Sequence, residues 1–136
     1  MAATIAGKSA SPPLSSTASL PPVKCARSAS RVRQVDRIAA FIRQHIPPDE
    51  CLLVAGDFND WGERLGAPMK ATGLRRAQVE GGAAARTFPS RMPLFSLDRI
   101  YTRGLHCIGT HVPRGPSWAR MSDHLPLVAE LALDAG

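Results

Sequence analysis

The chain has 136 residues, enough for one domain with a hydrophobic core, and a formal net charge of +6. Its first 35 residues hold five basic residues and no acidic one, whereas the rest hold 12 basic against 11 acidic residues. Five of the six excess positive charges therefore lie in the first 35 residues, and the nearly neutral remainder does not favour nucleic acid as the partner. No run approaches the roughly 18 consecutive apolar residues of a membrane-spanning helix.

Residues 1–30 are rich in Ser, Pro and Ala, and they are basic. Prolines and serines interrupt every apolar run there, which argues against a secretory signal peptide and favours a cytoplasmic protein. The composition is typical of a disordered leader, although an organelle transit peptide or a wrongly assigned start codon would also explain it. We therefore predict a disordered leader at 1–30 and a folded part at 31–136.

The three cysteines, Cys25, Cys51 and Cys107, are far apart and form no C-x-x-C pair. This pattern indicates neither a zinc ribbon nor a disulfide framework. Cys51 and Cys107 stand in apolar runs, where a cysteine is usually a small buried hydrophobe. His106 and His111 lie near Cys107, but the three lack the spacing of metal ligands.

An amphipathic helix is predicted to begin at Ser30, a residue suited to capping, and to end at Pro47, which cannot donate a backbone hydrogen bond. Residues 51–55 form a continuous apolar run, which is typical of a strand buried on both faces. The apolar positions of the helix recur at helical spacing: Val32, Val35, Ile38, Ala39, Ile42 and Ile46.

The remaining part alternates between strand patterns and loops. Residues 65–74 hint at a short helix, and glycines and prolines predict loops at 81–85 and 113–121. Further strands are expected from period-two or apolar patterns at 97–103, 106–112 and 125–133. One helix and about four strands in neighbouring order predict an α+β fold with a mostly antiparallel sheet.

Polar clusters interrupt the strands near their ends. Asp57 and Asn59 are two residues apart, so on a strand they face the same side. Asp98 would be costly to bury unless it is paired, and His124, which follows Asp123, is a candidate partner. Turn chemistry explains each cluster alone equally well. Together they provide a base, a cation, an orienting carboxylate and a metal ligand, which is the equipment for phosphoryl transfer.

Residues 56–59 (GDFN), 97–100 (LDRI) and 122–126 (SDHLP) resemble three motifs of the endonuclease/exonuclease/phosphatase family, in order and at compatible spacing. The helix around 33–38 is also similar to the family's helix before the GDFN strand. The resemblance covers about residues 31–133. It implies the C-terminal half of a DNase I-like fold, a four-layer α/β sandwich.

The resemblance also implies roles for individual residues. Asp57 would take the proton from the attacking water, and Asn59 would hold the nucleophile and the phosphate oxygens. His124, oriented and kept protonated by Asp98, would stabilise charge on the phosphoryl group. Asp123 would help to hold Mg²⁺ or Mn²⁺, which prefer oxygen ligands.

Thr87 and Phe88 stand where family members place residues that flank the substrate, although a packed aromatic turn explains them as well. The first half of the family domain supplies a glutamate that is the principal metal ligand, and no Glu precedes Glu50 here. We therefore expect a truncated phosphoesterase, weakly active or inactive alone, that acts on a phosphate ester of unknown class. The alternative is a non-catalytic interaction module whose open sheet face binds a partner chain or a second copy.

Overall fold

The computed structural model describes residues 3–8, 28–61, 65–79 and 82–134. Within these ranges the chain forms both helices and strands, and the mixture confirms the predicted α+β class. In chain order they are β1 (Ala3–Lys8), α1 (Ser28–His45), β2 (Cys51–Asp57), α2 (Gly66–Lys70), β3 (Arg75–Arg76), β4 (Asp98–Arg103), β5 (Leu105–His111), α3 (Pro116–Met121) and β6 (Val128–Leu133).

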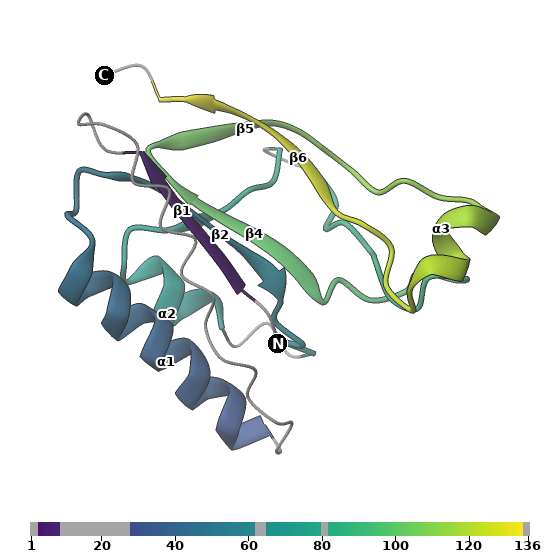
Figure 1. The fold of residues 1–136 in the computed structure, drawn as a ribbon, viewed down its shortest axis with the longest axis horizontal. Coiled ribbons are helices and arrows are strands. Elements are labelled where there is room, and N and C mark those ends of the chain that lie inside the picture. Colours follow the sequence, from purple (N-terminus) through teal and green to yellow (C-terminus); the bar gives the residue numbers. More distant parts are fainter. Residues whose placement is uncertain (1–2, 9–27, 62–64, 80–81, 135–136) are drawn as a thin grey trace.

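The strands form two antiparallel sheets (Figure 1). Four strands pair in the order β1-β2-β4-β3, and β5 pairs with β6 in a separate ribbon. Helices α1 and α2 lie on one side of the four-stranded sheet, and the β5–β6 ribbon lies on the other. The expectation of mostly antiparallel pairing is therefore confirmed.

Helix α1 has one apolar face and ends where the sequence predicts. Its last residue is His45, because Pro47 and Pro48 follow and neither can continue the backbone hydrogen bonds of the helix. The helix begins at Ser28, so Ser30 lies in its first turn and the prediction of a cap at Ser30 was wrong. None of the described helices is both long and apolar enough to cross a membrane.

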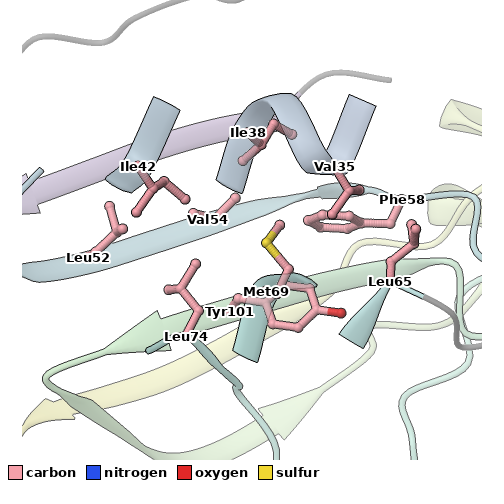
Figure 2. Packing of buried hydrophobic residues seen from close by; sticks show 10 residues of the cluster. All are labelled: Val35, Ile38, Ile42, Leu52, Val54, Phe58, Leu65, Met69, Leu74 and Tyr101. Carbon is pink, nitrogen blue, oxygen red and sulfur yellow. The ribbon is translucent and has the colours of Figure 1, made fainter. Parts of the chain in front are cut away.

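The hydrophobic core lies between α1, α2 and one face of the sheet (Figure 2). Leu52 and Val54 of β2 are fully buried there, because alternate residues of a strand point to the same face. Cys51, Leu53 and Ala55 on the opposite face are only partly buried, so the prediction of burial on both faces was wrong. The core residues are Val35, Ile38, Ile42, Leu52, Val54, Phe58, Leu65, Met69, Leu74 and Tyr101.

Strand β1 lies within the segment predicted to be a disordered leader, so that prediction was wrong for Ala3–Lys8. The strand pairs with β2 along its whole length, from Ala3 opposite Gly56 to Lys8 opposite Cys51. Without it β2 would be an edge strand whose backbone N–H and C=O groups lack ladder partners. Residues 9–27, which include Cys25, lie outside the described residues, and the division of the chain at residue 30 stays a prediction.

The turn between β4 and β5 depends on Gly104. Its φ of +68° lies in the left-handed region, and a Cβ there would come within 2.8 Å of the Cys51 sulfur. The chain can therefore reverse direction against β2 only with glycine at this position.

Strand β3 and helix α3 are the other elements that the sequence patterns do not predict, because each is too short to show a period.

We expect Ile42→Ala to lower the free energy of unfolding by about 2–5 kcal/mol, because its side chain is 1% exposed and the substitution leaves a cavity. Val32→Ala in the same helix is the matched control, since Val32 is 40% exposed, and it should change stability by less than about 0.5 kcal/mol. Urea unfolding followed by circular dichroism measures both. Equal effects would contradict the core described here.

Candidate active site

Two carboxylates meet at one end of the β2–β4 pair. The antiparallel register places Asp57, the last residue of β2, directly opposite Asp98, the first residue of β4. Directly opposed residues of an antiparallel pair project to the same face of the sheet. Both side chains are partly buried. The strand register, and not a flexible loop, therefore brings these two acidic groups together.

His124 joins them from the segment that leads into β6. Its Nδ1 lies 2.8 Å from Oδ2 of Asp98, and the two side chains are 22% and 21% exposed. The contact that the sequence predicted between Asp98 and His124 is thus confirmed. Donor atoms of Asp57, Asp98 and His124 all lie within 4.8 Å of one another.

Thr87 supports this pair from below the surface. Its hydroxyl donates a hydrogen bond to Oδ2 of Asp98 at 2.5 Å, and its backbone oxygen accepts one from the Leu125 amide at 2.8 Å. The side chain is completely buried, so it cannot contact a substrate. We therefore assign Thr87 to the positioning of Asp98 and His124. The sequence carries no signal for this contact, since the partners are distant in the chain.

The loop after β2 orients Asn59. The Asn59 amide donates to Oδ1 of Asp57 at 2.8 Å, and Asn59 itself has a φ of +51°, a conformation that asparagine tolerates better than most residues. The indole Nε1 of Trp61 donates to Oδ1 of the Asn59 side chain at 2.9 Å. The carboxamide of Asn59 is therefore held next to Asp57 through its side chain as well as its backbone.

The pKa of His124 is raised above its ordinary value of 6.5. Partial burial alone would lower the pKa, but the hydrogen bond to Asp98 and the negative charges of Asp98, Asp57 and Asp123 outweigh it. A pKa raised by folding stabilises the fold at pH values below 6.5, and this contribution is lost as the pH rises through the folded-state pKa. The site thus favours an imidazolium cation.

The carboxylates have the chemistry to hold a divalent cation. Within the described part of the chain, Oδ2 of Asp98 accepts two hydrogen bonds and Oδ1 of Asp57 accepts one. The other oxygen of each carboxylate can therefore bind a ligand. Oxygen donors suit Mg²⁺ and Mn²⁺. A histidine must be neutral to bind a metal, and Nδ1 of His124 is engaged with Asp98. The two aspartates therefore fit an ion better than His124 does.

Asp123 lies at the margin of this group. Its side chain is exposed, and Ser122 Oγ donates a hydrogen bond to Oδ1 of Asp123 at 3.4 Å. Its carboxylate is not among the donors that cluster within 4.8 Å, although its charge contributes to the raised pKa of His124. The predicted role of Asp123 as a metal ligand stays a prediction.

Aromatic rings line one side of the site. The Phe88 ring lies 4.8 Å from the imidazole of His124, and Trp61 contacts both Phe88 and Phe95, with ring centres 6.0 Å and 4.8 Å apart. Trp61 and Phe95 are exposed. Phe88 thus packs against the imidazole of His124, as a packed aromatic turn would, and its predicted place beside a substrate stays a prediction. The sequence patterns did not single out Trp61 and Phe95.

A buried ion pair fastens the loop that carries Asn59. Nη1 of Arg99 lies 2.8 Å from Oδ2 of Asp60, and these side chains are only 3% and 5% exposed. Arg99 also donates to the backbone oxygen of Asp60, and Asp60 accepts the Leu65 amide. Arg99 lies on the core face of β4, opposite in direction to Asp98, so one strand anchors the loop and presents the site carboxylate.

The sequence pattern of the endonuclease/exonuclease/phosphatase family matches residues 4–124. The chain therefore belongs to this family, whose members are metal-dependent hydrolases of phosphoesters. The match begins in β1, upstream of the region from residue 31 in which the motifs stand. The predicted leader at 1–30 therefore also includes residues that match the family.

Three curated relatives are similar to the chain: YbhP of Escherichia coli strain K12, YbhP of E. coli O6:H1 and YbhP of Shigella flexneri, each described as an uncharacterized protein. Each is 38% identical over 109 residues, which cover 79% of this chain and 43% of the relative. The chain therefore spans less than half the length of these relatives. No solved structure gives a significant match.

We expect Asp98→Asn to lower the pKa of His124, because the substitution removes the charge next to the imidazole while partial burial persists. An NMR titration of the histidine ring protons measures the shift. Asp134→Asn is the matched control, since that carboxylate lies 3.2 Å from Nδ1 of His106 at an exposed position. A His124 titration that responds equally to both substitutions would contradict the local pairing.

We expect Arg99→Met to lower the free energy of unfolding by about 3–5 kcal/mol, because it removes the guanidinium that pairs with the buried Asp60 carboxylate at 2.8 Å. The double substitution Asp60→Asn with Arg99→Met should cost less than the sum of the single substitutions, since each single substitution already breaks the ion pair. Chemical denaturation of the three variants measures this coupling. Strict additivity would show that the pair does not hold the loop.

Proposed function

We propose that this chain carries part of the catalytic centre of a metal-dependent phosphoesterase that hydrolyses phosphomonoesters or phosphodiesters. The observation that carries the proposal is the Asp98–His124 hydrogen bond of 2.8 Å next to Asp57. An imidazolium beside a carboxylate that can accept a proton suits the attack of water on a phosphorus centre. Membership of the family supports the same reaction.

In the proposed reaction Asp57 accepts a proton from the attacking water, whose oxygen forms the new bond to phosphorus. The bond from phosphorus to the leaving-group oxygen breaks, and the protonated His124 stabilises the charge on the phosphoryl oxygens. Asn59 orients the water and these oxygens from its fixed position beside Asp57. Asp98 acts through His124, which it orients and keeps protonated.

Asp57 and Asp98 would hold the divalent cation, Mg²⁺ or Mn²⁺, with Asp123 contributing directly or through water. Such an ion supplies Lewis-acid stabilisation of a phosphoryl oxygen when it is bound. The glutamate that the family resemblance implies as principal ligand has no counterpart before Glu50. We therefore propose that the chain alone is weakly active or inactive, and that it forms one part of a DNase I-like sandwich.

An interaction module is the second candidate, because apolar side chains stand exposed on the β5–β6 ribbon. Ile108 is 58% exposed and Leu133 is 56% exposed, and Val128 is also exposed. Surfaces of this kind mark contacts with another chain or a second copy. Calorimetric titration with Mg²⁺ and size-exclusion chromatography separate the candidates. A self-associating chain without metal affinity would favour the interaction module, whereas metal binding lost in Asp57→Asn would favour the phosphoesterase.

We expect slow Mg²⁺-dependent hydrolysis of bis(p-nitrophenyl) phosphate by the purified chain, and we expect Asp57→Asn to lower it by at least about a hundredfold, because the proton acceptor is lost. His124→Ala should have a similar effect. Release of p-nitrophenol measures the rate.

His106→Ala is the matched control for this assay, because His106 also contacts an aspartate but is exposed on β5. It should leave the rate unchanged. Turnover that persists in Asp57→Asn would overturn the proposed reaction. Rapid turnover by the unmodified chain, abolished by Asp57→Ala, would overturn only the proposal that the chain is weakly active alone.

A further inference from the structure

A pocket of about 540 Å³ opens beside the candidate active site, between the 90–93 turn and helix α3. Three arginines line it: Arg91, Arg114 and Arg120. None of its lining residues is acidic. It is therefore a concentrated positive site on a part of the chain whose basic and acidic residues nearly balance.

The arginines are not engaged elsewhere in the described part of the chain. Arg91, Arg114 and Arg120 are exposed, and none of them forms an ion pair or a side-chain hydrogen bond with a described residue. Three positive charges around one pocket repel each other, and an anion bound between them would offset this repulsion. Guanidinium groups bind phosphate with paired, parallel hydrogen bonds, which a lysine cannot provide.

The pocket and the candidate active site share the segments that build them. Leu125 lines the pocket and directly follows His124. Ser90, also in the lining, donates its backbone amide to the backbone oxygen of Asp123 at 2.7 Å. The pocket and His124 therefore lie on segments that are joined directly through the backbone.

We propose that this arginine pocket binds a second phosphate group of the substrate, so that the preferred substrates carry two phosphates, one hydrolysed beside Asp57 and one held by Arg91, Arg114 and Arg120. The inference rests on the proposed phosphoesterase function, and it narrows the substrate class. A soluble bisphosphate and a phospholipid headgroup share this chemistry. Met92 and Met121 are exposed and adjoin Arg91 and Arg120 in the sequence. A phospholipid headgroup is therefore tested as a ligand together with a soluble bisphosphate.

Binding is tested first without turnover and without metal. The 136-residue chain is titrated with inorganic phosphate and with fructose 1,6-bisphosphate while the Nε–Hε signals of its arginines are followed by NMR. We expect saturable shifts of the signals of Arg91, Arg114 and Arg120. The double substitution Arg91→Gln with Arg120→Gln should weaken binding about tenfold or more, because two charge-assisted contacts are lost.

Arg37→Gln with Arg43→Gln is the matched control, since both residues are exposed on α1 and the loss of net charge is the same. It should leave the affinity unchanged. Equal weakening by the two double substitutions, or shifts that do not saturate, would overturn the inference. Circular dichroism melting verifies that all variants are folded.

A second arm distinguishes the sources of the phosphate. Cosedimentation is measured with vesicles of phosphatidylcholine, with and without phosphatidic acid. Retention on the acidic vesicles that is lost in Arg91→Gln with Arg120→Gln assigns the pocket to a lipid headgroup, and saturable binding of the bisphosphate alone assigns it to a soluble ester. Binding of neither probe overturns the inference.

The outcomes separate this inference from the proposed function. Phosphate binding that persists in Asp57→Asn and His124→Ala, in a chain with neither Mg²⁺ affinity nor metal-dependent turnover, would support the arginine pocket and contradict the proposed reaction. Turnover of bis(p-nitrophenyl) phosphate in a chain whose arginine signals do not respond to phosphate would support the proposed reaction and contradict phosphate binding in the pocket.

Discussion

The antiparallel register of β2 and β4 is the constraint on which the site depends. It places Asp57 opposite Asp98, and a shift by one residue would turn one carboxylate to the core face and bring Arg99 to the site. The core prevents such a shift, because Leu52, Val54 and Tyr101 are buried only in the observed register. The hydrophobic packing against α1 therefore fixes the position of the acidic groups.

Two polar networks keep the charged groups stable so close to the core. Asp98 accepts hydrogen bonds from Thr87 and His124, which offset the cost of its partial burial. On the opposite face of the same strand, Arg99 pairs with buried Asp60 and anchors the loop after β2. Asp98 and Arg99 thus each have a partner for their charge, and each pair also orients a segment that reaches the candidate active site.

Local patterns in the sequence predicted the parts of this arrangement that depend on short-range periodicity. Helix α1 and strand β2 followed from apolar spacing, and the Asp98–His124 contact followed from the cost of burying a carboxylate without a partner. Strand β1 was missed because a short strand is stabilised by the edge that it pairs with, which its own composition does not show. The buried role of Thr87 was missed because its partners are brought to it only by folding.

Net charge says little about the site, since a sum over the chain contains no information about position. The basic and acidic residues beyond residue 35 nearly cancel, yet folding separates them into carboxylates around Asp57 and arginines around the neighbouring pocket. His124 adjoins both groups. An anionic ligand is repelled by the first and attracted by the second, so under the proposal the pocket would orient a substrate that carries two phosphates before either one meets the carboxylates. The separation of charge, and not its total, therefore determines which end of such a ligand would reach Asp57.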